Sequence, residues 1–179
     1  DYNFMGIVGK GEMELKYPFI PNMLNAETFS ILDKLFSVEG DSIQIIYNQN
    51  FKPSKADEGN QGIPHYHYIS KTGEKKIYKK QYVSLPEYIN KPKVIMTAKA
   101  GYDKGRLFTF YSDDILGTTN NSMYMLTEDK AHGEKLVNFF NSDVITFLMK
   151  ITQYSEPPNR INEFKILNQL KVPDSMDKY

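Results

Sequence analysis

The spacing of apolar residues predicts one helix early in the chain. Phe29, Leu32 and Phe36 recur at helical spacing. They follow Asn25, a residue type that favours a helix N-cap, and they precede Gly40, where we expect the helix to end. The residues before this helix have no clean period, and two Xaa-Pro pairs among them favour extended chain. We therefore expect an irregular opening segment followed by a helix.

The middle of the chain has the pattern of a β-sheet. A polar stretch over residues 48–62 predicts a long loop, and Lys71-Thr72-Gly73 has the composition of a hairpin turn. Around these segments, apolar residues alternate with polar ones or form short continuous runs, as expected for strands. The predicted strands lie at residues 43–47, 63–70, 74–83, 93–99, 106–111 and 122–126.

After Thr127 the apolar period becomes helical. Leu136, Phe139 and Phe140 share one helix face, Asn141-Ser142 forms a break, and residues 144–151 continue on a second helix. A last short helix is predicted over 161–170. Strands followed by helices indicate an α+β fold, with a mixed or antiparallel central sheet and a C-terminal helical cluster. We divide the single predicted domain, 1–179, into an irregular segment with one helix (1–40), a basic sheet region (41–127) and helices (128–173).

Length and composition narrow the class of protein. A chain of 179 residues with 40% hydrophobic residues is long enough for one domain with a sizeable core. The absence of cysteine excludes a disulfide scaffold, a thiolate zinc site and cysteine catalysis. No apolar run approaches the roughly 18 residues that span a bilayer, so we expect no membrane association. The absence of cysteine fits a reducing compartment, and we expect an intracellular location, in the cytoplasm or in a virus-infected host cell. Because the chain begins at Asp1 rather than Met, we expect it to be a fragment of a longer polypeptide.

Charge is distributed unevenly although it sums to zero. Residues 71–106 contain ten Lys or Arg and three acidic residues, a net charge of +7, and the remainder of the chain carries −7. Such a basic segment, with Tyr78, Tyr82 and Tyr102 interleaved, is typical of a phosphate-binding surface. A solvated lysine-rich strand edge that prevents aggregation explains the charge equally well. The basic residues of interest are Lys75, Lys76, Lys79, Lys80, Lys93, Lys99, Lys104 and Arg106.

Other candidate chemistry is weaker. His65 and His67 are two residues apart on a predicted strand, so both imidazoles could hold one metal ion, but no third ligand is near in sequence and an ordinary strand surface is the better interpretation. Glu163 and Lys165 have the Glu-Xaa-Lys spacing of metal-dependent nucleases, although they fall in a predicted helix. The sequence therefore predicts neither a catalytic residue nor a metal site.

The order of motifs in the second half is informative. It resembles the C-terminal target-recognition domain of DNA adenine methyltransferases, of the TaqI-like and type IIG restriction-modification class that includes viral relatives. The resemblance covers roughly Pro92 to Pro173. Phe140 departs from it, standing where Leu commonly precedes Asn-Ser. The segments that carry the resemblance are Pro92–Met96, Ala100–Tyr102, Asp114–Thr119, Ser122–Met125, Leu136–Ser142 and Ile145–Lys150.

The resemblance implies sequence-specific recognition of double-stranded DNA. It also implies that a catalytic methyltransferase domain or subunit, with its S-adenosylmethionine, lies upstream of Asp1, because neither the cofactor loop nor an Asn-Pro-Pro-Tyr-type motif is present. This chain alone is then expected to bind no cofactor and not to methylate. The predicted DNA-binding residues are Lys76, Lys79, Lys80, Lys93, Lys99, Tyr102, Lys104, Arg106, Asn120 and Asn121.

Two alternatives of other classes stay open at this point. One is a metal-dependent nuclease centred on Glu163 and Lys165. The other is a non-catalytic protein-interaction domain that uses the aromatic-rich helices around Phe139, Phe140 and Phe147.

Overall fold

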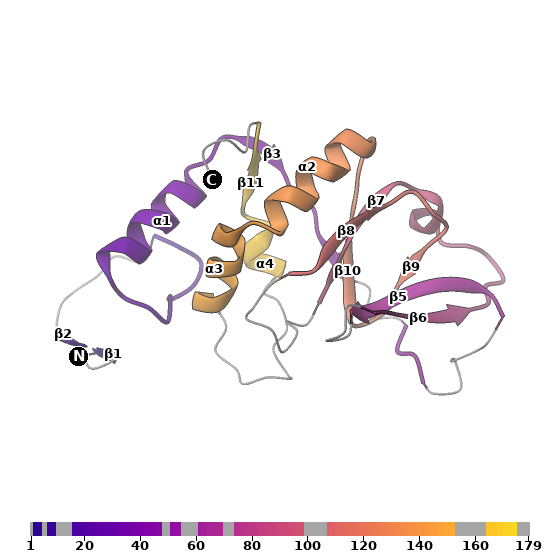
Figure 1. Cartoon of the computed structure of the whole chain (residues 1–179), viewed down its shortest axis with the longest axis horizontal. Coiled ribbons are helices and arrows are strands. Elements are labelled where there is room, and N and C mark those ends of the chain that lie inside the picture. The colour runs from indigo at the N-terminus through magenta and orange to yellow at the C-terminus, as the bar shows by residue number, and fades with distance from the viewer. Residues whose placement is uncertain are drawn as a thin grey trace.

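The computed structural model describes residues 2–4, 7–9, 16–47, 51–54, 61–69, 74–98, 107–152 and 164–174. Helices, a four-stranded sheet and a three-stranded sheet lie side by side in this order (Figure 1). The helices cover one face of the four-stranded sheet, and the three-stranded sheet covers the other. This confirms the predicted α+β class.

The four-stranded sheet lies in the middle. Its order is β4 (Ile46–Tyr47), β10 (Ser122–Leu126), β7 (Lys93–Thr97) and β8 (Thr109–Ser112), with antiparallel neighbours throughout. Every residue of β7 is buried. Val94 and Met96 belong to the core on the helical side, and Ile95 belongs to the core on the other side. A strand covered on both faces needs apolar residues in succession, which explains the continuous run in its sequence.

The first helix begins after Asn25 and the next two are separated at Asn141-Ser142, as predicted, but the first helix ends at Phe36 rather than at Gly40. The described helices are α1 (Ala26–Phe36), α2 (Lys130–Phe140), α3 (Asp143–Thr152) and the short α4 (Phe164–Leu167). Asn25 caps α1 by accepting a hydrogen bond from the Thr28 backbone N–H at 2.8 Å. Between α2 and α3, the Asn141 side chain accepts from the Thr109 N–H at 3.2 Å and donates to the Thr109 carbonyl at 3.1 Å. The break between these helices is thus tied to the edge strand β8.

The main core lies between these helices and the four-stranded sheet. Phe139 and Phe140 are fully buried in it, so they are not exposed to a protein partner. Neither ring can therefore contribute to the protein-interaction surface that the sequence left open as an alternative, because both rings pack inward. Only Phe147 of that predicted group is partly buried.

The three-stranded sheet contains the basic hairpin. β5 (Ile63–Ile69) and β6 (Lys75–Lys80) pair antiparallel, as predicted, and β9 (Gly117–Thr118) pairs parallel with β5. The pairing shifts by one residue at His67, which forms a β-bulge. A second, smaller core joins this layer to the four-stranded sheet through Tyr66, Ile95 and Tyr124, and the 3₁₀ helix η2 (Glu87–Asn90) packs against it through Tyr88.

Two short strand pairs were missed by the sequence pattern. β1 (Tyr2–Phe4) and β2 (Ile7–Gly9) pair in the segment predicted to be irregular. β3 (Gly40–Ser42) pairs with β11 (Lys171–Pro173), so the segment 128–173 is not purely helical. Gly40 permits this pairing, because a Cβ at that position would lie 2.0 Å from the Val172 carbonyl oxygen. No helix among the described residues is long and apolar enough to cross a membrane.

Candidate nucleic-acid interface

The four lysines of β6 divide between two sides of the strand. Lys76 and Lys80 alternate with Lys75 and Lys79, and successive side chains of a strand point to opposite faces. Tyr78 lies between Lys76 and Lys80 and is paired with His65 of β5, which places these residues on one side. On the other side, the Lys75 ammonium lies 3.7 Å from the centroid of the Phe110 ring. The strand thus places two of its three predicted DNA-binding lysines, Lys76 and Lys80, on one side and the third, Lys79, on the other.

A continuous row of contacts leads from Lys76 across the sheet. The Lys76 ammonium lies 5.4 Å from the Tyr78 ring centroid, and Tyr78 contacts His67 edge-to-face at 4.9 Å. His67 Nε2 accepts a hydrogen bond from Asn121 Nδ2 at 3.0 Å, and its Nδ1 bonds Thr119 Oγ1 at 2.7 Å. These residues, with Lys80 and Asn120, form what we call the lysine–aromatic face: Lys76, Tyr78, Lys80, His67, Asn120 and Asn121.

Lys80 borders an aromatic hollow at the end of this face. Its ammonium lies 4.9 Å from the Phe51 ring centroid and 5.1 Å from that of Tyr82. Among the described residues, no carboxylate lies within ion-pairing distance of Lys80. The hollow has a volume of about 350 Å³ and is called the aromatic pocket here. It is lined by Ile46, Tyr47, Phe51, Lys80, Tyr82, Pro86, Tyr88 and Tyr124.

Buried His65 fixes the wall of the aromatic pocket. Its ring contacts Phe51 edge-to-face at 5.0 Å and stacks on Tyr82 at 5.5 Å. Nδ1 lies 2.9 Å from the Ile63 carbonyl oxygen, and because a carbonyl can only accept, Nδ1 carries the proton. Burial and the charge of Lys80 lower the pKa of His65 despite this hydrogen bond, so the ring is neutral at pH 7.

The neutral imidazole of His65 determines whether the Tyr82 hydroxyl acts as a hydrogen-bond donor or acceptor toward a ligand. Nε2 of His65 has a free lone pair and lies 2.7 Å from the Tyr82 hydroxyl, so Tyr82 donates its proton to His65. Burial, aided by the neighbouring Tyr88, raises the pKa of Tyr82 to about 12, and the phenol keeps its proton. The lone pairs of the Tyr82 oxygen are left as acceptors.

Asn120 and Asn121 are held at the lysine–aromatic face by different hydrogen bonds. The Asn120 backbone is held on both sides: its N–H donates to the Phe51 carbonyl at 2.8 Å, and its carbonyl accepts from the Tyr47 hydroxyl at 2.6 Å. Its half-buried side-chain amide has no hydrogen-bond partner among the described residues. Asn121, in contrast, uses Nδ2 to hold His67, and its Oδ1 is enclosed. Asn120 is therefore the better candidate to contact a ligand, and Asn121 positions His67.

Lys93 is a correction to the sequence prediction. Its side chain is fully buried, and Nζ donates hydrogen bonds to the carbonyl oxygens of Ile89 at 3.0 Å and Asp114 at 3.3 Å. Burial lowers the pKa of Lys93, although Asp114 and Asp113 oppose this shift. An ammonium enclosed by the protein cannot reach a phosphate, so Lys93 stabilises the fold through these hydrogen bonds and does not contact DNA.

The remaining predicted contacts are placed as follows. Lys79 is exposed, on the side of β6 away from Lys80. Four of the predicted DNA-binding residues, Lys99, Tyr102, Lys104 and Arg106, lie outside the described residues, and so does Glu163 of the alternative nuclease site. Lys165 of that site is exposed on α4.

The His65–His67 pair is not part of a metal cluster among the described residues. The ring nitrogens of His65 bond Ile63 and Tyr82, and those of His67 bond Thr119 and Asn121. Because His65 is fully buried, the expectation of an ordinary strand surface is wrong at that residue. It supports the aromatic pocket instead.

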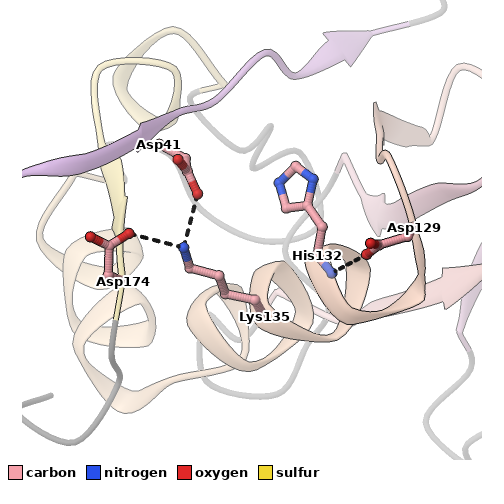
Figure 2. A network of polar contacts seen from close by, with 5 residues as sticks. All are labelled: Asp41, Asp129, His132, Lys135 and Asp174. Carbon is pink, nitrogen blue, oxygen red and sulfur yellow. Dashed lines mark hydrogen bonds and ion pairs between the residues drawn. The ribbon is translucent and has the colours of Figure 1, made fainter.

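A second hollow, of about 560 Å³, lies between β3 and the start of α2. There Lys135 binds Asp41 at 2.8 Å and Asp174 at 3.5 Å, and Asp129 caps α2 through the His132 backbone N–H (Figure 2). The ion pair with Lys135 lowers the pKa of Asp41 and raises that of Lys135. These contacts join α2, β3 and the end of β11, so they serve the fold.

Sequence reasoning missed most of the aromatic pocket. Tyr82 was noted for its place among lysines, but Tyr47, Phe51, Tyr88 and Tyr124 come from segments separated by up to 77 residues. A density of 13 tyrosines without any tryptophan is the sole signal in the sequence, and it does not say which rings meet. The chemistry of this face rests on its own geometry, since comparisons with models of protein families, with curated proteins and with solved structures find no match for this chain.

Proposed function

We propose that this chain is a double-stranded DNA-binding domain whose lysine–aromatic face contacts the phosphate backbone. The supporting observation is that Lys76 and Lys80 lie on one side of β6 together with Tyr78. The Lys80 ammonium lies over the ring of Phe51, whose carbonyl accepts the backbone N–H of Asn120. Four residues of strand separate the two lysines by about 13 Å, a distance over which a DNA strand presents several phosphates. Lys80, which has no carboxylate partner among the described residues, is the strongest of these contacts.

The resemblance of Pro92–Pro173 to target-recognition domains supports a more specific form of this proposal. In that form, the chain selects a DNA sequence for a DNA adenine methyltransferase or restriction-modification enzyme, and S-adenosylmethionine is bound by another domain or subunit. Asn120 supports base reading here, because an amide can donate to and accept from an adenine edge at once. Its backbone is held by Phe51 and Tyr47, so its side chain is presented from a fixed point.

Two double variants of the same strand test the phosphate contacts. Lys76→Gln with Lys80→Gln removes two charges from the lysine–aromatic face, whereas Lys75→Gln with Lys79→Gln removes two charges from the opposite side. Each phosphate contact contributes about 0.9 to the slope of log affinity against log salt concentration. We expect the first pair to reduce the slope by about 1.8 on a duplex of random sequence. The second pair serves as a control of equal charge and should leave the slope close to that of the parent chain.

Equal slopes for the two pairs would remove the lysine–aromatic face from the DNA site. Sequence selection is tested separately, by retaining duplexes from a random pool and sequencing them. The parent chain should enrich a short motif, and Asn120→Ala should relax the preference at one or two positions without changing the salt slope. Enrichment that Asn120→Ala leaves unaltered contradicts base reading by that residue.

A further inference from the structure

The aromatic pocket is lined for a flat ring. Tyr88 and Tyr124 stack with their centroids 4.3 Å apart and their planes within 14°, and Tyr47, Phe51 and Tyr82 complete the aromatic lining. Aromatic side chains bind planar groups by stacking and by edge contacts, with little loss of conformational entropy. Five rings around one hollow favour a planar aromatic ligand over an aliphatic one.

Charge at the same pocket favours a ligand with an anionic group. Lys80 lines the pocket, and its ammonium lies over the rings of Phe51 and Tyr82. No carboxylate among the described residues neutralises it. An ammonium held at the rim by aromatic faces can still bind a phosphate, because cation–π contacts leave its N–H donors available.

The hydroxyl of Tyr82, which lines the pocket, favours a ligand that carries a hydrogen-bond donor. The hydroxyl proton of Tyr82 is donated to His65, so the Tyr82 oxygen accepts hydrogen bonds from a ligand. Exocyclic amino groups of nucleobases are donors of this kind. The volume of about 350 Å³ is near the lower end of the range for ligand pockets, which suits one base with its phosphate and is small for a dinucleotide.

We infer that the aromatic pocket binds a single nucleobase together with its own phosphate, with the base among the tyrosines and the phosphate on Lys80. This ligand chemistry has two sources: a free nucleotide, or a nucleotide of DNA that has left the base stack. Only the second source rests on the proposed function, because there the pocket receives one base while Lys76 and Lys80 hold the adjoining backbone.

Calorimetric titration with deoxyadenosine monophosphate tests the free-nucleotide source. Deoxyribose 5-phosphate, which lacks the base, should bind at least about fivefold more weakly, since stacking of a base contributes about 1–3 kcal/mol. Tyr82→Leu should remove that difference, whereas Tyr68→Leu, a change at a tyrosine that is 41% exposed and outside the pocket, should keep it. Lys80→Gln should weaken the nucleotide more than Lys79→Gln does, which tests the phosphate contact in a variant that leaves every ring in place.

Three duplexes test the DNA source: one fully paired, one with a single unpaired adenine, and one with an abasic residue at the unpaired position. Preference for the unpaired adenine over the abasic duplex, lost in Tyr82→Leu, assigns the pocket to an unstacked base of DNA. Binding of the mononucleotide without this preference assigns it to a free nucleotide. The inference is overturned if deoxyadenosine monophosphate binds no more tightly than deoxyribose 5-phosphate and the duplex with the unpaired adenine binds no more tightly than the abasic duplex. Failure of the proposed function gives a different result, namely no difference in salt slope between the two lysine pairs on the fully paired duplex.

Discussion

Gly117→Ala should disrupt the support of the aromatic pocket, although the change adds a single methyl group. A Cβ at residue 117 would lie 2.3 Å from Nε2 and 2.4 Å from Cδ2 of His65. The imidazole cannot turn away without loss, because both nitrogens are hydrogen-bonded and the ring packs on Phe51 and Tyr82. Overpacking costs about 1–3 kcal/mol, and each lost hydrogen bond adds about 1 kcal/mol. We therefore expect a loss of about 2–4 kcal/mol in the free energy of unfolding.

A double-mutant cycle separates this steric cause from a general effect of alanine. His65→Ala removes the imidazole, so Gly117→Ala should cost little when His65→Ala is already present. The expected coupling between the two sites is therefore close to the full cost of Gly117→Ala, about 2–4 kcal/mol. Urea unfolding followed by tyrosine fluorescence measures it, because the chain has 13 tyrosines and no tryptophan. Additive effects, within about 0.5 kcal/mol, would refute the clash as the cause.

Two further predictions concern pH and salt. Burial lowers the folded-state pKa of His65 below its unfolded value of about 6.5, so the unfolded chain binds the proton more readily and stability is lost as pH falls below about 6.5. The urea concentration at the unfolding midpoint should decrease as the pH is lowered from about 7 to about 5. The decrease should be smaller in His65→Gln, whereas the control variant His132→Gln should behave like the parent chain. Equal pH dependence in the parent chain and His65→Gln contradicts the prediction. Lys135→Met should lower the urea midpoint at low salt and have less effect at high salt, because it breaks the ion pairs with Asp41 and Asp174. Lys130→Met, which removes only the exposed pair with Glu134 at 3.7 Å on the same helix, should have a smaller effect at either salt concentration.

The elements that the sequence predicted correctly are those with a long or well-bounded pattern. The helix after Asn25, the break at Asn141 and the hairpin of β5 and β6 are set by local chemistry: a side-chain cap, a polar interruption, and two strand-forming runs around a turn sequence. The pairing of β3 with β11 was missed because three-residue strands have too few positions to show a period. Lys93 was misplaced because alternation cannot tell a solvent-facing lysine from one that meets backbone carbonyls inside the protein.

The candidate site was predictable only in part, for a related reason. Charge along the chain located the strand with Lys76 and Lys80, and polar type suggested Asn120. The division of the lysines into two sides needed the register of β6 against β5. The aromatic pocket needed contacts between β4, β6, β10 and η2, which are distant in sequence. Tertiary pairing, not local preference, assembles it.

The pairing of β3 with β11 has a consequence for how this protein is made. Its register joins Gly40 to Pro173 and Ser42 to Lys171, so the pair cannot form until nearly all the described residues have been synthesised. Val172 and Leu170 also complete the core that surrounds α1. Leu32 and Leu35 of α1 belong to the same core, so during translation this core stays incomplete until residues about 135 positions downstream have been made. At synthesis rates of about 5–20 residues per second this interval lasts roughly 7–27 seconds, during which the apolar side chains of the incomplete core are open to aggregation.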